Sequence, residues 1–212
     1  MVSQLGQDRY LMDEIYPGKR DGYFVDVGAH DGRSISNTWL LERDLGWRGV
    51  CVEPLPVEFG KLRAARPQSH CVQAAVTAAQ DSGDVAFTEI LNSNMLSGLD
   101  AHLPRHVVDS NESRTTHVRA RTLTSILDEA RAPAWIDYLS VDTEGSELEV
   151  LRGIDFSRYT FGFVTLEHNY DEPRRTEIRE FLAARDYVYH RPNQWDDDYV
   201  HASLHAKLAA RK

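Results

Sequence analysis

Short hydrophobic runs alternate with helical patterns along most of the chain. A strand is predicted where apolar and β-branched residues follow one another without a break, and a helix where apolar residues recur every three or four positions. By these criteria the strands are 23–27, 49–52, 70–76, 138–141 and 161–166, with a closing pair at 187–190 and 199–204. The helices between them are 36–45, 59–66, 147–152 and 174–185. Strands that are apolar throughout are typical of a parallel sheet with helices on both faces, so the pattern predicts a doubly wound, mainly parallel α/β fold with about seven strands.

One polar stretch interrupts this alternation. Two β-like pieces, 85–90 and 117–121, flank a segment from about 91 to 116 that has no clear periodicity. A long loop inside a compact domain is usually functional or disordered. We interpret this one as a lid or a wall of a substrate site, with plain disorder as the alternative. Since no repeat and no Pro-, Gly- or Ser-rich linker divides the chain, residues 1–212 are expected to form a single domain.

The charge balance limits the partners. The 212 residues include 24 basic and 33 acidic side chains, which gives a net charge of −9. Because an acidic surface repels phosphate backbones, we expect no nucleic-acid partner and favour small neutral, cationic or metal-bridged substrates. A homo-oligomer is compatible with this composition.

The compartment is also predicted from composition. No apolar run reaches the roughly 20 residues that span a bilayer, and the first 16 residues lack the features of a signal peptide. Cys51 and Cys71 lie in apolar surroundings, as expected of two reduced thiols. A cytoplasmic protein without a membrane partner is the expectation.

A glycine-containing segment, here called the glycine loop, follows the first strand. It runs from Asp26 to Gly32 and has the spacing G-x-x-x-G, with Gly28 first and Gly32 last. Ligands of open α/β sheets bind beyond the carboxyl ends of the strands, where a glycine lets the backbone come close to them. Because the G-x-G-x-x-G spacing of dinucleotide sites is absent, the loop favours a nucleoside without phosphates. A purely structural glycine turn is the alternative.

An acidic residue ends the second strand. Glu53 directly follows 49–52 and lies 27 residues after Asp26. A carboxylate at this position can accept hydrogen bonds from both ribose hydroxyls of an adenosine. The alternative is an exposed acid in the turn before Pro54.

Polar residues also follow the fourth and fifth strands. They are Asp142 and Glu144 after the fourth strand, and Glu167, His168 and Asn169 after the fifth. Carboxylates can hold the amino group of a cofactor, ligate a divalent ion or take a proton, and a histidine can act as a base. Because the ends of neighbouring parallel strands share one edge of the sheet, we expect these side chains to face one cleft.

Two nearby features are interpreted as structural. Ser146 and Glu149 fit a capping box at the start of the helix 147–152, where Glu147 also suits the helix dipole. The acidic run 196–198 is interpreted as a solvated turn, with an aspartate that faces the cleft as the alternative.

Taken together, these motifs resemble the FkbM family of methyltransferases. The resemblance rests on an ordered set that extends from residue 3 to about 200: Ser-Gln-x-Gly-Gln-Asp at 3–8, the glycine loop, Ser-Asn-Thr at 36–38, Gly-Trp-Arg-Gly at 46–49, Val-Glu-Pro at 52–54, Asp-x-Glu-Gly-x-Glu at 142–147 and Glu-His-Asn at 167–169. The resemblance implies an S-adenosylmethionine-dependent O-methyltransferase with a Rossmann-like fold. Its substrates would be hydroxyl groups of small molecules such as natural products or sugars.

The same resemblance implies which residues hold the cofactor. They are Asp26, Gly28, His30 and Gly32 beside its methionine and ribose parts, together with Asn37, Glu53 at the ribose, Ala75 near the adenine, and Asp142 at the amino group. The segment 92–116 does not align with the family, so the identity of the acceptor is not implied.

Two mechanisms are open for methyl transfer to a hydroxyl. In the first, a general base takes the hydroxyl proton; the candidates are His168, Glu144 and Glu167. In the second, Mg²⁺ lowers the pKa of the hydroxyl and is held by Asp142, Glu167 and Asn169. A nicotinamide-dependent oxidoreductase and a non-catalytic binding module of the same fold are the alternative functions.

Overall fold

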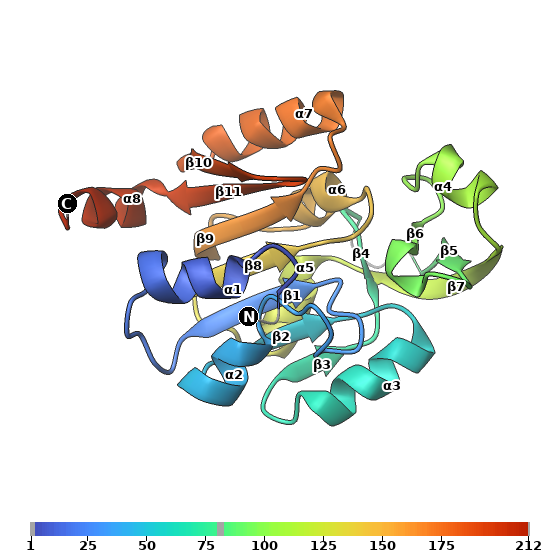
Figure 1. Ribbon diagram of the computed structural model, residues 1–212, viewed down its shortest axis with the longest axis horizontal. Helices are drawn as coiled ribbons and strands as arrows, with labels where there is room; N and C mark the ends of the chain where they lie inside the picture. Colours follow the sequence, from blue (N-terminus) through green and yellow to red (C-terminus); the bar gives the residue numbers. More distant parts are fainter. Residues whose placement is uncertain (1–2, 80–82, 212) are drawn as a thin grey trace.

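A seven-stranded sheet forms the centre of the molecule (Figure 1). The computed structural model describes residues 3–79 and 83–211. The strands of this sheet are β1 (Tyr23–Val27), β2 (Arg48–Val52), β3 (His70–Val72), β8 (Trp135–Val141), β9 (Thr160–Glu167), β10 (Tyr187–Asn193) and β11 (Asp196–His201). Their order is β10-β11-β9-β8-β1-β2-β3, and only β11 runs antiparallel to its neighbours. The doubly wound, mainly parallel fold predicted from the hydrophobic pattern is confirmed.

The order of the strands creates a switch point between β1 and β8. After β1 the chain moves outward to β2 and β3, and it later returns to the other side of β1 to form β8 and β9. The connections from these two strands therefore leave in opposite directions, and a crevice opens at their carboxyl ends.

Successive strand residues face two separate hydrophobic cores. Val25 and Val27 face a core closed by α5 (Leu123–Glu129), α6 (Glu147–Arg152) and α7 (Glu172–Ala183). Phe24 faces the opposite core, which is closed by a π-helical turn (Leu11–Ile15) that continues α1 (Gln7–Tyr10), and by α2 (Trp39–Leu45), α3 (Pro56–Ala65) and α8 (Ala202–Ala209). The helices thus cover both faces of the sheet, and the valine-rich strands are buried on each side.

A second, four-stranded sheet stands beside the first (Figure 1). It consists of β4 (Ala75–Val76), β5 (Asp84–Ile90), β6 (Gly98–Leu99) and β7 (Ser113–Arg121) in the order β4-β7-β5-β6. The single strand predicted over 70–76 is therefore wrong. After Val72 the chain leaves the main sheet, and Ala75 pairs with Ala120 of β7 instead.

Residues 91–112, here called the insertion, connect β5 to β7 and contain short elements rather than a plain loop. They are a 3₁₀ turn, η2 (Asn94–Leu96), the strand β6 and the helix α4 (Arg105–Asp109). Each is too short to produce a recognisable periodicity, which is why the sequence showed only a polar stretch. The pairing of β6 with β5 folds the insertion back over the carboxyl ends of the main strands.

The acidic run 196–198 is a buried part of β11, so its interpretation as a solvated turn is wrong. Asp197 is 2% exposed and accepts two hydrogen bonds from the Arg175 guanidinium, each of 2.8 Å. Asp198 accepts one from Arg191 at 2.6 Å, and Asp196 accepts one from the Gln7 amide at 2.7 Å. Partners from three other elements make the burial of these carboxylates possible, and the local sequence does not reveal them.

Within residues 3–79 and 83–211, none of the helices combines the length and hydrophobicity that crossing a membrane requires.

A pair of glycine substitutions tests the packing of the sheet. A Cβ at Gly49 in β2 would overlap the carbonyl oxygen of Phe24 on the paired β1 strand, whereas a Cβ at Gly60 in α3 meets nothing within 4 Å. Gly49→Ala is expected to lower the free energy of unfolding by about 3 kcal/mol or more. Gly60→Ala is the matched control and should raise it by about 0.5–1 kcal/mol, since alanine is the better helix former. Thermal denaturation measures both, and equal midpoints for the two variants would contradict this account of the packing.

Candidate active site

A cavity of about 260 Å³ lies at the carboxyl ends of β1, β2, β8 and β9. Its other side is formed by β5 and the insertion, through Phe87 and residues between 93 and 99. The volume is slightly below the roughly 300–1,000 Å³ that is typical of small-molecule sites. The crevice at the switch point is therefore a cavity with room for a small ligand.

The glycine loop is held between two strands. Gly28 has a φ of 87°, and a Cβ there would overlap the carbonyl oxygen of Asp142 at the end of β8. The amide of Gly28 donates to the carbonyl of Val52 at 3.0 Å, and the amide of Asp142 donates to that of Val27 at 3.0 Å. Glycine is required here because two backbone segments meet, and this contact brings the ends of β1, β2 and β8 together.

Gly32 packs against the end of α3. A Cβ at this position would lie 2.6 Å from the Leu62 side chain and 2.9 Å from that of Arg66. Gly32 does not line the cavity, whereas Gly28 does. This packing fits the structural alternative for Gly32, and its contact with the cofactor stays a prediction.

Glu53 is buried at the wall of the cavity and is 5% exposed, so the alternative of an exposed acid in a turn is wrong. Its Oε2 accepts a hydrogen bond of 3.0 Å from the His30 amide, and its Oε1 accepts one of 2.9 Å from the Leu55 amide. Burial raises the pKa of Glu53 to about 7, although these two hydrogen bonds oppose the shift. Each carboxylate oxygen has a further lone pair, so Glu53 can still accept hydrogen bonds from a ligand.

Asn37 lines the same wall and has an acceptor without a partner. Its Nδ2 donates to the Ser140 hydroxyl at 2.9 Å, but its buried Oδ1 has no hydrogen-bond partner among the described residues. A buried polar atom without a partner costs about 1–3 kcal/mol, so such an atom at a cavity is suited to a ligand donor.

Asp26 lies at the base of the glycine loop and is hydrogen-bonded to Thr38. It accepts a hydrogen bond of 2.6 Å from the Thr38 hydroxyl, which in turn accepts one of 3.0 Å from the fully buried Arg66. Burial raises the pKa of Asp26, and the charge of Arg66 opposes that rise. The arrangement fixes Asp26 at the base of the glycine loop, where it also lines the cavity.

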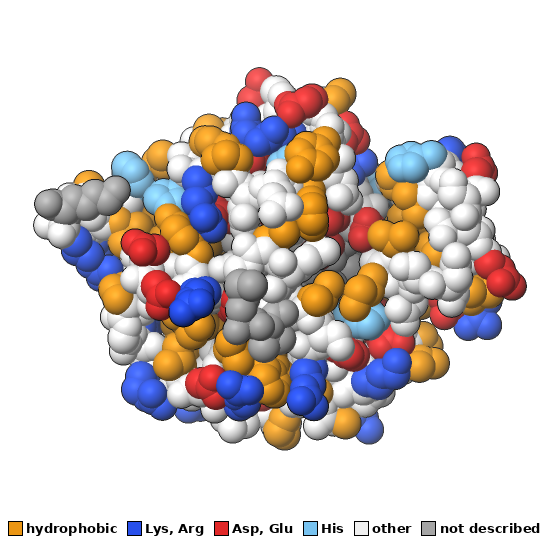
Figure 2. Space-filling view, in the orientation of Figure 1, with side chains coloured by type: hydrophobic (Ala, Val, Ile, Leu, Met, Phe, Trp, Pro, Cys, Tyr) orange, Lys and Arg blue, Asp and Glu red, His pale blue; other side chains and the backbone are white. Residues whose placement is uncertain are grey.

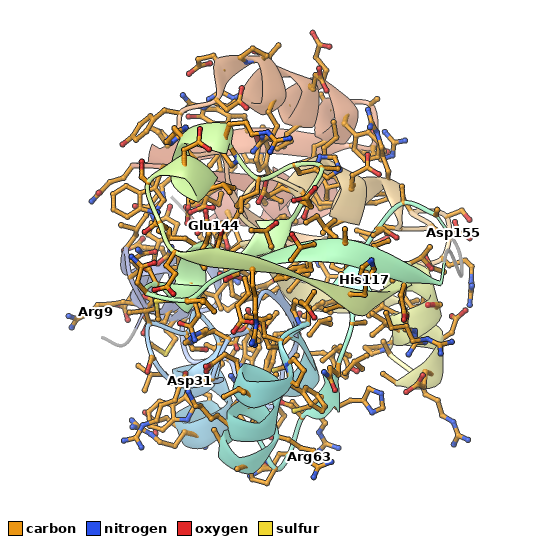
Figure 3. All side chains as sticks on the ribbon, turned by 90° about the vertical axis from the view of Figure 1, so that its right-hand side faces the viewer. Arg9, Asp31, Arg63, His117, Glu144 and Asp155 are labelled. Atoms are coloured by element: carbon orange, nitrogen blue, oxygen red, sulfur yellow. The ribbon has the colours of Figure 1, made fainter. Side chains whose placement is uncertain are left out.

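Three carboxylates form the opposite wall. Asp142, Glu144 and Glu167, here called the carboxylate cluster, each place an oxygen within 4.8 Å of the others. Among residues 3–79 and 83–211, no lysine, arginine or histidine forms a salt bridge with any of them. Figure 3 shows Glu144 in the middle of the molecule, close to the green ribbon of the insertion.

The pKa values of the cluster are raised by burial and by mutual repulsion. Burial is the larger cause for each group, and the pKa of Asp142 and that of Glu144 each rise to about 7. Burial also raises the pKa of Glu167, and the charges of Asp142 and Glu144 beside it raise it further. At neutral pH the cluster therefore holds protons that isolated carboxyl groups would have lost.

A different contact from the predicted capping box shapes the turn after β8. Ser146 makes no side-chain cap, and the buried Glu147 instead accepts hydrogen bonds from the amides of Thr143 (3.1 Å) and Gly145 (2.9 Å). This carboxylate holds a turn in which Glu144 has a φ of 54°. The turn directs the chain so that Glu144 lies at the cavity.

His168 and Asn169 do not line the cavity. The His168 Nδ1 accepts a hydrogen bond of 3.0 Å from the Tyr170 amide, and its Nε2 lies 3.6 Å from Asp197 Oδ1. Burial lowers the pKa of His168. The Asn169 Nδ2 donates to Glu167 Oε2 at 2.8 Å and to Glu144 Oε2 at 3.3 Å, so Asn169 supports the cluster as a donor, and its role as a metal ligand stays a prediction.

Most of the chain matches a known protein family. The family model described as the methyltransferase FkbM domain matches residues 26–189, which is well over half of the chain and includes every residue of the cavity wall formed by the main sheet. The chain belongs to the FkbM methyltransferase family. Membership decides in favour of an S-adenosylmethionine-dependent methyltransferase and against the nicotinamide-dependent oxidoreductase.

Solved methyltransferase structures resemble this FkbM methyltransferase distantly. A TehB-like SAM-dependent methyltransferase from Corynebacterium glutamicum is 10% identical, with a TM-score of 0.49 and coverage of 94% of this chain and 89% of that one. The precorrin-6y C5,15-methyltransferase from Geobacter metallireducens is 12% identical, with a TM-score of 0.49 and coverage of 91% and 85%. A search of curated proteins found no match to the chain.

Most of the residues predicted from the sequence of this FkbM methyltransferase come together. The cavity is lined by Asp26, Gly28, His30, Asn37, Glu53, Ala75, Asp142, Glu144 and Glu167, whereas Gly32, His168 and Asn169 lie outside it. Sequence reasoning missed Ser140. Residues two positions apart in a strand face the same side of the sheet, so Ser140 could have been predicted from the position of Asp142. It also missed Phe87, for which the sequence carries no signal. Residues 93–97 and Leu99 belong to the segment that was interpreted as a lid or a wall of a substrate site, although none of them was predicted individually.

Proposed function

We propose that this FkbM methyltransferase transfers a methyl group to a hydroxyl of a small neutral or cationic molecule. The observation that carries the proposal is the charge of the cavity wall. Five carboxylates line it, and no lysine or arginine among the described residues does so. An anionic acceptor would meet like charges in a partly buried site, whereas a sugar-like hydroxyl or an amine would find hydrogen-bond acceptors.

The wall formed by the glycine loop fits S-adenosylmethionine. The acceptor oxygens of Glu53 suit the ribose hydroxyls, the free Asn37 Oδ1 suits a ligand donor, and Ala75 belongs to an apolar patch with Leu55 and Phe87 that suits an adenine. Asp26, Gly28 and His30 would lie along the methionine and ribose parts, with Asp142 at the amino group. When bound, this cofactor supplies an electrophilic methyl group on a sulfonium.

The carboxylate cluster and the insertion form the proposed acceptor side. Met95, Leu96 and Leu99 present an apolar surface, and Glu144 lines the same cavity beside Gly98 of the insertion. An acceptor held there would place its hydroxyl against a carboxylate with a pKa of about 7, which is well suited to a general base at neutral pH. Glu144 would take the hydroxyl proton as the oxygen attacks the methyl group.

We also propose that the protein acts on a small molecule in the cytoplasm and has no nucleic-acid partner. On the face shown in Figure 2, basic side chains are scattered among acidic ones, which supports the absence of a nucleic-acid partner. Cys51 and Cys71 are unpaired, as is usual in a reducing compartment.

Titration calorimetry with S-adenosylhomocysteine tests the cofactor wall. We expect the wild type to bind, and Glu53→Ala to bind about 10–100-fold more weakly, since hydrogen bonds to a charged group are lost. Glu180→Ala, which changes an exposed carboxylate on α7, is the control and should bind like the wild type. Unchanged affinity in Glu53→Ala would remove Glu53 from the site, and no binding by the wild type would favour the non-catalytic module.

The pH dependence of the reaction tests the base. Because a base must be deprotonated, the turnover rate on a hydroxylated acceptor should rise between pH 6 and 8 with a midpoint near 7. Glu144→Gln should lower the rate by about 10²–10⁴ and abolish this rise, while the affinity for S-adenosylhomocysteine stays within a few-fold of the wild type. Release of S-adenosylhomocysteine from a panel of acceptors provides the measurement. A loss of this size in His168→Gln, with Glu144→Gln active, would favour the histidine instead.

The magnesium variant of the mechanism has a donor set available. Asp142, Glu144 and Glu167 would hold the ion, because oxygen ligands of this kind suit a hard divalent cation. In this set Glu144 is the third ligand, whereas the sequence analysis named Asn169.

A chelator separates the two mechanisms. With Glu144 as base, we expect activity to persist in excess EDTA and the thermal midpoint of the protein to be unchanged by millimolar Mg²⁺. Loss of activity in EDTA that Mg²⁺ restores, together with a Mg²⁺-dependent rise of the midpoint that Glu144→Gln abolishes, would replace the base mechanism with the metal variant.

A further inference from the structure

Asn94, in the η2 turn of the insertion, bonds to two elements on the cofactor side of the cavity. Its Nδ2 donates to Glu58 Oε1 of α3 at 2.7 Å, and its Oδ1 lies 3.1 Å from the Nε2 of His30 in the glycine loop. The His30 Nε2 is also 3.6 Å from Glu58 Oε2. The three side chains thus form a closed triangle between the insertion, α3 and the glycine loop.

These contacts lead directly to the proposed ribose acid. The backbone amide of His30 donates to Glu53, so its main chain is fixed by one carboxylate and its ring by Asn94. Glu58 is 2% exposed, and its other side-chain bonds go to the exposed end of Lys61. A hydrogen bond to a buried carboxylate is stronger than one to a neutral group, so the bond from Asn94 to Glu58 is well placed to hold the insertion.

No other hydrogen bond between described residues joins the insertion to the glycine loop or to α3. Residues 93–97 and Leu99, here called the acceptor wall, line the cavity on both sides of Asn94. A displacement of Asn94 would therefore move residues 93–97 of the acceptor wall, while Leu99 stayed in place because its strand β6 pairs with β5.

We propose that Asn94 is a positioning residue that couples the acceptor wall to the cofactor side of the site. A cofactor that orders Glu53 and His30 also orders Asn94, and the acceptor wall is then set for its substrate. Coupling of this kind is reciprocal, so the acceptor must strengthen cofactor binding by the same factor. The inference rests on the proposed function, because it takes the cavity as a shared site for a cofactor and an acceptor.

Asn94→Ala removes both hydrogen bonds without adding bulk. Under the proposal, hydrogen exchange in the peptide that covers 91–99 slows when S-adenosylhomocysteine binds to the wild type, and this protection is lost in Asn94→Ala. The KM for the acceptor should rise about tenfold or more, with a smaller change in kcat. Asn92→Ala is the matched control, since the Asn92 amide donates within the insertion, to Asn111 at 3.0 Å, and to no other described residue.

Exchanging the amide of Asn94 with the carboxylate of Glu58 tests whether the contact can be restored. Asn94→Asp alone places two carboxylates together and should behave like Asn94→Ala or worse. The double variant Asn94→Asp with Glu58→Gln reverses donor and acceptor across the same contact, and it should recover most of the ligand-dependent protection. If Asn94 only stabilised the fold, the thermal midpoints of these variants would change in step with their KM values. The proposal instead requires that the ligand-dependent protection of 91–99 changes while the thermal midpoint stays nearly constant.

The decisive measurement is the hydrogen exchange of 91–99 with and without S-adenosylhomocysteine in the wild type, Asn94→Ala, Asn92→Ala and the double variant. Loss of protection in Asn94→Ala alone, with recovery in the double variant, supports the coupling. Equal protection in the wild type and Asn94→Ala overturns it even when the cofactor binds normally. If the wild type bound no S-adenosylhomocysteine by calorimetry, the proposed function itself would fail, and that outcome is distinct from the failure of the coupling.

Discussion

The close approach of Gly28 to the carbonyl of Asp142 is the constraint on which the site depends. The strands β1 and β8 lie on the two sides of the topological switch, and their ends can meet only where one residue lacks a Cβ. The amides of the same loop bond to the end of β2. One contact therefore brings three strand ends together, and the acids that follow those strands face one cavity as a consequence.

Once the strand ends are together, electrostatics shapes the site. Glu53 on one wall and the carboxylate cluster on the other are removed from water and lie near further carboxylates, so their pKa values rise. The folded state then binds more protons than the unfolded chain. The contribution of these groups to stability is largest below their unfolded pKa values near 4 and declines as the pH rises toward 7. The chain tolerates this cost where a cationic ligand or a proton can neutralise the cavity, which suits a site for a sulfonium cofactor and a hydroxyl acceptor.

The insertion adds the part of the site that the sheet cannot supply. The strand ends offer mainly carboxylates, hydroxyls and backbone, while Met95, Leu96 and Leu99 of the insertion provide apolar surface. Asn94 ties this apolar side to α3 and to the glycine loop through two hydrogen bonds. The cavity thus combines the edge of the main sheet with a short segment that has few anchors, and such segments are where local stability is usually lowest.

The sequence by itself determined the fold class and the residues at the ends of the strands. Continuous apolar runs separated by helical patterns favour buried strands, and in a parallel sheet the residues after such runs share one edge. Glu53, Asp142, Glu144 and Glu167 were therefore found from position, whereas Asp26 came from the resemblance to the family. Tertiary structure decided everything that depends on partners distant in the chain. Asp197 is buried because Arg175 reaches it, the His168 ring lies outside the cavity with its Nε2 3.6 Å from Asp197 Oδ1, and the acceptor wall exists because β6 pairs with β5. None of these contacts follows from periodicity or spacing, since each depends on how elements far apart in the sequence meet in space.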